Sequence, residues 1–484
     1  MSQEIFINVG VAEVRVAVVT EHELQALSST RILGGEAATT LVGDIVLGRV
    51  VRVVPAVQAA FVEIGHERAG FLGAREARVL QLHAPGEPSI GELVHEGEKV
   101  LVQIVKDPIG DKGARLTAAV TTPGRYCVLT PYQVGAALSR RIEDEAERRR
   151  LSAMAEEILA GSGCGCILRT AAIGITAAEL RDDLDRLRLE WEATVAAAGV
   201  SDAPATLHRD LGPIERALRD MVHDDTRKIL IDEPRALERA RDYCRRAMPH
   251  VENRLSLFCG PGGLFDDLES DIDGLMQPRV RLACGGWITF EATEALTAVD
   301  VNSGSFSRSS ALEDTGLTVN LEAATEIGRQ VRLRGVGGLI VIDFIHMREP
   351  EHVAAVLEAL SQGLSRDSTP FNIGPLTSFG LIEVTRKRVR EPLVDHWSEP
   401  CPQCGGLGHV RRVEAAAMEA IRRIERAARA APGKPLELHA APEVVRWLDE
   451  EGAIAALARS LRLEIIAEAS FPRERFEVGT SGHG

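Results

Sequence analysis

Apolar and polar residues alternate along the first quarter of the chain, which predicts strands rather than helices. Residues 1–19 alternate in this way, and residues 42–116 hold short valine-rich stretches separated by glycine and proline. Side chains of a strand point to opposite faces in turn, so each stretch can bury one face. Short strands broken at this spacing are typical of a small β-barrel.

Beyond residue 138, apolar residues recur at the spacing of helices. A charged amphipathic helix is predicted over 139–160. A second helix is expected after Thr176, with Glu179 at the position that completes a capping box. A proline-containing loop near 203–213 then precedes a stretch, 214–248, that we expect to be helical.

The next region mixes strands and helices. Alternating strands are expected on both sides of Gly285–Gly286, followed by strand 296–302, helix 311–334 and strand 338–345. Strand, helix, strand is a crossover unit, which lays its two strands parallel and adjacent with a right-handed connection.

Three polar residues interrupt the two strands of this unit. Asp300 and Asn302 are two apart and therefore share a face, and Asp343 breaks the second strand. Both carboxylates fall toward the carboxyl ends, where open α/β sheets keep their ligands. Close carboxylates repel unless one protonates or a cation joins them, and Mg²⁺ suits such oxygen ligands. A bound Mg²⁺ can position a water and neutralise a phosphodiester, with Asn302 orienting the water or a phosphate oxygen. The alternative is that these residues cap loops.

Two aromatic residues mark the predicted barrel. A hairpin turning near His66 would place Phe61 and Phe71 nearly opposite each other. Such a pair can stack unpaired bases, and Lys112 in a glycine-flanked loop can supply a cation for the backbone. Alternatively, both rings belong to the barrel core.

A Cys-x-x-Cys motif, Cys401 and Cys404, presents two thiolates at the spacing of half a zinc site. His409 is a weak third ligand, and the simplest completion is the same pair from a second copy of the chain. A redox pair, for which no thioredoxin-like context is evident, and a plain turn are the alternatives.

The amino-acid composition limits the class of protein to which this chain can belong. The 484 residues suggest about three domains, and 45% hydrophobic with 26% charged residues is ordinary for a globular protein. The net charge of −15 argues against non-specific coating of nucleic acid, although the run 385–390 is a local basic patch. We find no apolar run of membrane-helix length and no signal-peptide pattern, and we expect a cytoplasmic protein.

These constellations, in this order, resemble the bacterial ribonuclease E/G family. The resemblance covers nearly the whole chain and is closest to the shorter, ribonuclease G type. It is carried by the segments "GRVVRVVPAVQAAFVEIGHERAGFL", "RTAAIG", "ALTAVDVNSGSF", "RQVRLRGVGGLIVIDFIHM" and "CPQCGGLGHV".

The resemblance implies an α+β multidomain fold. Its parts would be a split RNase H-like part, an inserted OB-type RNA-binding barrel and 5′-sensor, a DNase I-like catalytic domain, a zinc link and a small C-terminal domain. The corresponding ranges are 1–37 and 213–278 for the RNase H-like part, 38–122 for the barrel, 123–212 for the sensor, 279–398 for the catalytic domain, 399–414 for the link and 415–484 for the last domain.

The resemblance also implies a Mg²⁺-dependent endoribonuclease that cleaves single-stranded A/U-rich RNA, leaving 5′-phosphate and 3′-hydroxyl ends. Its expected substrates are ribosomal RNA precursors and messenger RNA. The implied roles are magnesium binding by Asp300 and Asp343 with Asn302 beside them, RNA contact by Phe61, Phe71 and Lys112, 5′-phosphate binding by Gly124, Val128, Arg169 and Thr170, and zinc binding between chains by Cys401 and Cys404.

The zinc link implies a dimer or a dimer of dimers, and no large degradosome scaffold region is expected. Two positions depart from the family pattern. His346 stands where members often have a further Asp, and Ser378 stands where some carry an Arg that assists the phosphate sensor. Two other functions remain open: an RNA-binding or ribosome-assembly protein with structural carboxylates, and a DNA nuclease.

Overall fold

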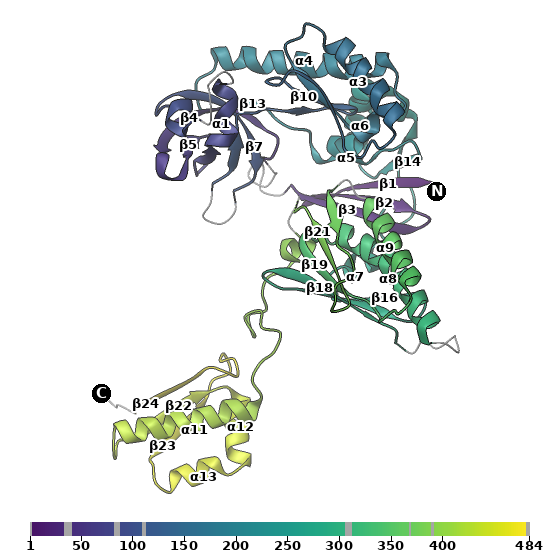
Figure 1. Ribbon diagram of the computed structural model, residues 1–484. Coiled ribbons are helices and arrows are strands. Elements are labelled where there is room, and N and C mark those ends of the chain that lie inside the picture. Colours follow the sequence, from purple (N-terminus) through teal and green to yellow (C-terminus); the bar gives the residue numbers. More distant parts are fainter. Residues whose placement is uncertain are drawn as a thin grey trace. The chain divides into compact units, whose positions relative to one another are not determined.

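The computed structural model describes residues 2–32, 41–81, 88–108, 113–304, 312–366, 369–388 and 392–480, with backbone only for 312–315. The chain divides into two compact units, Met1–Arg390 and Glu391–Gly484 (Figure 1). It is a mixed α+β multidomain protein, as expected. Within the described residues, no helix is both long and apolar enough to span a bilayer.

The first sheet joins distant parts of the chain, in the order β15-β14-β1-β2-β3. Strand β1 runs parallel to β14, with Phe6 opposite Leu230. The predicted helical stretch 214–248 is therefore wrong at its centre, where β14 separates two helices. This short apolar strand pairs with β1 from the N-terminus on one side and with β15 on the other, so both partners lie outside the stretch itself. The elements are β1 (Gln3–Val9), β2 (Glu13–Thr20), β3 (Glu23–Arg31), α5 (Pro213–Met221), β14 (Thr226–Ile231), α6 (Pro234–Ala247), β15 (Leu255–Leu257) and α7 (Glu269–Gly274).

A small closed barrel follows, as predicted, and it is consistent with an OB-like domain. Strand β4 pairs with both β5 and β7, and the remaining pairs β5–β6, β6–β8 and β7–β8 complete the ring. Strand β13, in the region expected to be a loop, extends the sheet from β4. The elements are β4 (Ile45–Val54), β5 (Ala59–Glu63), β6 (Gly70–Gly73), α1 (Ala74–Ala77), α2 (Ile90–Leu93), β7 (Lys99–Lys106), β8 (Arg115–Thr117) and β13 (Ala205–His208).

A four-stranded sheet, β11-β12-β10-β9, packs against two helices. The first helix begins at Glu145, later than predicted, because Asp144 caps it and the chain before it hydrogen-bonds to β12 instead. The second has the predicted capping box of Thr176 and Glu179. The elements are β9 (Thr122–Pro123), β10 (Cys127–Thr130), β11 (Gly135–Leu138), α3 (Glu145–Leu159), β12 (Gly165–Leu168) and α4 (Ala177–Val200).

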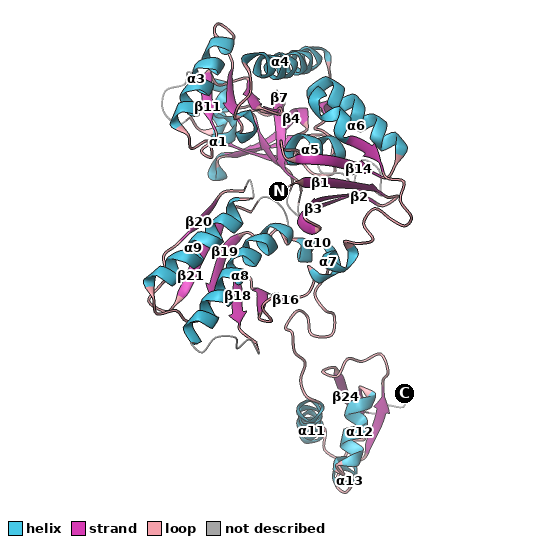
Figure 2. Cartoon of the chain, turned by 90° about the vertical axis from the view of Figure 1, so that its right-hand side faces the viewer, coloured by secondary structure: helices cyan, strands magenta, loops and turns pink. Residues whose placement is uncertain are grey.

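A six-stranded sheet, β16-β17-β18-β19-β21-β20, carries the predicted crossover unit. Strands β18 and β19 are parallel neighbours, as predicted. Helices α8 and α9 lie side by side over one face (Figure 2). They touch at Gly328 and Gly363, where a Cβ on Gly328 would lie 2.6 Å from backbone. The elements are β16 (Arg279–Arg281), β17 (Trp287–Ala292), β18 (Leu296–Asn302), α8 (Leu312–Leu333), β19 (Gly338–Asp343), α9 (Pro350–Ser365), β20 (Phe371–Ile373) and β21 (Leu381–Arg386).

The second unit has its own core around a three-stranded sheet, β23-β22-β24. Its central strand carries His439, whose two ring nitrogens lie 2.9 Å from Glu468 Oε1 and 2.7 Å from Glu437 Oε1. The elements are α10 (Leu393–Trp397), α11 (Val413–Ala430), β22 (Leu436–Ala440), α12 (Pro442–Glu450), α13 (Ala453–Ala458), β23 (Leu463–Ala467) and β24 (Phe476–Thr480).

The stability of this sheet should depend on pH through His439. Hydrogen bonds to Glu468 and Glu437 raise the pKa of His439, so the fold favours the protonated ring. This stabilisation is complete below the unfolded pKa of about 6.5 and is lost as pH rises through the higher folded value. Amide hydrogen exchange in β22, corrected for intrinsic rates, should show protection falling from pH 6 to pH 9. His439→Gln should remove that fall and His409→Gln should keep it; equal pH dependence in wild type and His439→Gln would contradict the prediction.

Candidate active site

The two predicted metal ligands lie directly opposite each other. In the parallel pair β18–β19, Asp300 is the register partner of Asp343. Their neighbours Val299, Val301 and Ile342 are buried in the core beneath α8 and α9, while both aspartates are exposed. Partners in register share a face of the sheet. Both carboxylates therefore project from the face opposite the helices, at the carboxyl ends of their strands.

Asn302 orients one of these carboxylates. Its side-chain amide donates a hydrogen bond of 2.6 Å to Asp300 Oδ2. Asn302 itself is half-buried. One oxygen of Asp300 is thereby fixed, and among the described residues no hydrogen bond to its Oδ1 is found.

Asn320, which the sequence analysis did not single out, fixes the end of β19, the strand that carries Asp343. Asn320 of α8 is fully buried, and its amide makes two hydrogen bonds to the backbone of Ile345. Nδ2 donates to the carbonyl at 2.7 Å, and the Ile345 N–H donates to Oδ1 at 3.0 Å. Ile345 follows Asp343 by two positions, so Asn320 fixes the chain where it leaves the sheet. An asparagine within an apolar helical face was the available signal.

The donor set fits a hard divalent cation that keeps part of its hydration shell. No cluster of three or more His, Cys, Asp or Glu suited to a metal occurs among the described residues. Two carboxylates with an amide beside them, open to solvent on one face, match the way Mg²⁺ is held with several waters. A zinc site usually includes nitrogen or sulfur ligands, and the three residues named here supply only oxygen atoms and an amide. His346 is exposed near this edge, and Ser378 is exposed in the loop before β21.

The barrel places its two aromatic residues as expected. Phe61 and Phe71 are register partners in β5 and β6, and their ring centroids lie 6.1 Å apart at 80°. Both are half-buried, and neither belongs to the barrel core. A surface position leaves ring area accessible. Lys112 lies outside the described residues.

Of the four residues predicted to bind a 5′-phosphate, Arg169 and Gly124 are in contact. The guanidinium of Arg169 donates to the carbonyl of Gly124 at 2.7 Å and to Asp220 Oδ1 at 2.7 Å. Thr170 follows Arg169 and is exposed, and Val128 lies on the neighbouring strand β10. The N–H of Gly124 already donates to the Cys127 carbonyl.

Gly124 has a steric role. A Cβ at this position would lie 2.6 Å from Asp183 Oδ2. Asp183 is buried on α4 and accepts the N–H of Tyr126 at 2.8 Å. This contact ties the turn before β10 to α4, and only glycine leaves room for it.

Arg169 belongs to a larger charged cluster. Asp220 also accepts two bonds from Arg219, of 3.0 and 2.8 Å. Burial alone would raise the pKa of Asp220, but hydrogen bonds and charge from Arg219 hold it below its ordinary value. Arg125 is buried beside them and donates to the carbonyls of Arg219 and Val222. A phosphate at Arg169 would therefore meet a guanidinium that already has a carboxylate partner.

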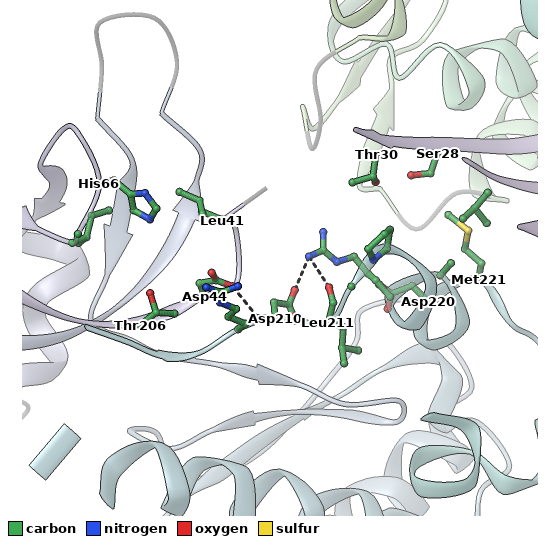
Figure 3. A pocket seen from close by; sticks show the side chains of 18 of the residues that line it. Ser28, Thr30, Leu41, Asp44, His66, Thr206, Asp210, Leu211, Asp220 and Met221 are labelled. Carbon is green, nitrogen blue, oxygen red and sulfur yellow. Dashed lines mark hydrogen bonds and ion pairs between the residues drawn. The ribbon is translucent and has the colours of Figure 1, made fainter. Parts of the chain in front are cut away.

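A cavity of about 530 Å³ is lined by Asp220 but by none of the four residues predicted to bind a 5′-phosphate (Figure 3). Its lining comes from β3, the barrel and residues 204–221. Asp210 links the sides, because it accepts from Arg216 at 3.0 Å and its N–H donates to Asp44 at 2.9 Å. Burial raises the pKa of Asp44.

In the second unit, Cys401 is exposed and Cys404 is half-buried. Backbone N–H groups of Cys404 and Gln403 lower the pKa of Cys401, which favours the thiolate that binds metals. His409 is exposed.

Two carboxylates that face each other at the carboxyl ends of neighbouring strands, together with a separate OB-like barrel, are typical of an enzyme that hydrolyses nucleic acid. A model of the Ribonuclease E/G family matches residues 121–389. Ribonuclease G of Escherichia coli strain K12 is 35% identical over 493 residues, covering 99% of each chain. Ribonuclease G of Haemophilus influenzae is 35% identical, covering 98% of this chain and 99% of its own. Ribonuclease E of a Nostoc species is 42% identical over 383 residues, covering 77% of this chain and 55% of its own.

The chain therefore belongs to the Ribonuclease E/G family. This membership makes it an endoribonuclease of RNA processing. A second model, described as "RNase E/G, Thioredoxin-like domain", matches residues 400–478. The expectation that the Cys-x-x-Cys motif has no thioredoxin-like context is therefore wrong.

Replacing Asn320 by leucine should destabilise the first unit. The variant removes both side-chain hydrogen bonds to the N–H and the carbonyl of Ile345, which is half-buried. A backbone group left unpaired away from water costs about 1–3 kcal/mol. We expect the urea unfolding transition of the first unit to move by about 2–4 kcal/mol. The exposed Asn372 offers a matched control, since Asn372→Leu should change it by less than about 0.5 kcal/mol. Equal shifts in the two variants would refute a special role for Asn320.

Proposed function

We propose that this chain is a Mg²⁺-dependent endoribonuclease that cleaves single-stranded, A/U-rich RNA and leaves 5′-phosphate and 3′-hydroxyl ends. The observation that supports this most is the register of Asp300 against Asp343 on the open face of the sheet. Its substrates are ribosomal RNA precursors and messenger RNA, and it works in the cytoplasm.

The chain's own residues prepare this site. Asp300 and Asp343 present carboxylate oxygens on neighbouring strands, and Asn302 holds Asp300 in one orientation by donating to its Oδ2. Asn320 keeps the end of β19 in place through Ile345. Bound Mg²⁺ would supply charge neutralisation at the phosphodiester and a water of lowered pKa.

The finer architecture follows the family pattern. The shared sheet of β1–β3 with β14 and β15 supports an RNase H-like part split between 1–37 and 213–278. The OB-type barrel, 38–122, and the 5′-sensor, 123–212, are inserted in it. The DNase I-like catalytic domain is 279–398, the zinc link 399–414 and the small domain 415–484.

RNA is held at two further places. Phe61 and Phe71 stack unpaired bases on the barrel with Lys112 contacting the backbone, which their half-buried surface position supports. A 5′-monophosphate binds beside Gly124, Val128, Arg169 and Thr170. Because Asp220 already engages Arg169, the phosphate must share that guanidinium with a carboxylate.

Zn²⁺ is bound by Cys401 and Cys404 together with the same pair of a second chain, so that the enzyme assembles as a dimer or a dimer of dimers. The lowered pKa of Cys401 supports metal binding by its thiolate.

Removing either catalytic carboxylate should abolish most activity. For Asp300→Asn and Asp343→Asn we expect the cleavage rate of a fluorogenic single-stranded RNA with Mg²⁺ to fall by more than about a hundredfold. Losing a ligand should cost more than the 10- to 100-fold typical of an outer-shell partner. Glu383, exposed on the adjacent strand β21, provides the control, and Glu383→Gln should stay within about threefold of wild type. Near-normal rates in both aspartate variants would rule out the proposal.

Cys404→Ser should lower zinc content and self-association together. Two thiolates per chain cannot complete a four-ligand site alone, so loss of one should release the metal and the partner. Metal analysis and native mass measurement report both, and the exposed single Cys259 provides a control as Cys259→Ser. A zinc-free wild type of unchanged mass would contradict the shared site and favour a dithiol or a plain turn.

A further inference from the structure

The open face of the six-stranded sheet carries more than the two aspartates. Register partners share a face, so the face of Asp300 and Asn302 continues across β17 and β16. Asn302 is paired with Trp287, and Trp287 is paired with Arg281. Arg279, two positions before Arg281, lies on the same face. Arg279, Arg281 and Trp287, here called the Trp287 patch, therefore lie beside the candidate active site.

Trp287 is a surface aromatic by its position in the strand. The alternate residues Ile288 and Phe290 are 0% and 7% exposed and belong to the core under α8 and α9. Trp287 is half-buried and lies outside that core. A large indole on the solvent face of a sheet adds nothing to this core, which leaves its ring area for another partner.

Arg279 is stacked on the indole. Its guanidinium carbon lies 3.7 Å from the ring centroid of Trp287, at the distance of a close cation–π contact. Arg279 and Arg281 are both exposed. Neither forms an ion pair with a carboxylate in the part of the chain that the structure describes. The two cations lack an ion-pair partner among the described residues, and the hollow that they line beside β16 also contains Glu23, Asp271, Glu322 and Glu326.

Gly304, two residues after Asn302, lies near the same ring. Gly304 has a φ of +61°, and a Cβ there would lie 3.1 Å from Cζ3 of Trp287. Gly304 therefore lies close to one edge of the indole, where a larger residue would crowd the ring.

The spacing matches one step along a nucleic-acid strand. Neighbouring strands are about 4.8 Å apart and two residues along a strand span about 6.7 Å. Trp287 is one strand from Asn302, and Asp300 is two residues back along β18. A base at the Trp287 patch would therefore belong to a nucleotide next to the phosphate at Asp300 and Asp343.

We propose that the Trp287 patch is a base-stacking subsite for an unpaired nucleotide of the RNA, adjacent to the scissile phosphate. The base stacks on the platform that Trp287 and Arg279 form, and Arg281 contacts a phosphate of the same RNA strand. Stacking of this kind does not depend on base identity. The subsite rests on the proposed function, because the Asp300–Asp343 pair defines which nucleotide it holds. It positions the strand at the catalytic sheet, separately from Phe61 and Phe71 on the barrel.

The test measures binding of short single-stranded RNA to inactive full-length protein carrying Asp343→Asn. One oligonucleotide is intact, and a series carries a single abasic nucleotide at successive positions around the cleavage site. Removing the base that stacks should weaken binding about tenfold, within the range of base–aromatic stacking. Trp287→Ala should weaken binding of the intact RNA by the same factor and be insensitive to that abasic position. Trp287→Phe should keep most of the affinity.

Intrinsic fluorescence gives a second readout that does not depend on affinity. RNA should quench tryptophan emission in the parent protein, and Trp287→Phe should remove most of the quenching. Trp191→Phe, on α4, is the matched control and should keep it.

Equal losses at every abasic position in both the parent and Trp287→Ala would overturn the subsite, as would unchanged quenching in Trp287→Phe. The fluorescence result decides the matter if Trp287→Ala fails to fold. Catalysis is scored separately, by cleavage with wild type. Coupling between Trp287 and one base without any cleavage would refute the proposal that the Asp300–Asp343 pair cleaves RNA, and would leave a base-binding site.

Discussion

The register between β18 and β19 is the constraint on which the site depends. Parallel pairing without a shift places Asp300 opposite Asp343 on one face of the sheet. The neighbouring valines and isoleucines of the same two strands point to the other face. A slip by one residue would turn one carboxylate into the core. Helices α8 and α9 enforce this register from the apolar side, and Asn320 fixes it at the end of β19. The same packing that stabilises the domain therefore determines where two like charges meet.

Charge is distributed unevenly over this acidic chain. Beside Arg169, the carboxylate of Asp220 bonds to both Arg169 and Arg219, so these cations already have a carboxylate partner. On the six-stranded sheet, Arg279 and Arg281 lack such partners among the described residues, and Arg279 stacks on Trp287 instead. The difference separates cations that organise the fold from cations that remain available to a phosphate backbone.

The sequence predicts those parts of the fold that depend on local pattern and chain order. The crossover unit, the pairing of Asp300 with Asp343, the hairpin of Phe61 and Phe71 and the cap at Thr176 are all confirmed. Strand β14 was missed because its partner β1 lies more than 200 residues earlier, a pairing that no local periodicity reports. Asn320 was missed because its partner is backbone in another segment. Trp287 was missed because its nearness to Asn302 appears only once the β17–β18 register is known.

The central claim is that one cation joins two carboxylates from neighbouring strands. Anomalous diffraction from crystals of the full chain soaked in Mn²⁺ tests it directly, since Mn²⁺ takes the same oxygen ligands as Mg²⁺. The account predicts a peak within about 2.2 Å of one oxygen each from Asp300 and Asp343. A peak held by only one of them, or no peak at this edge while one forms elsewhere, would contradict it.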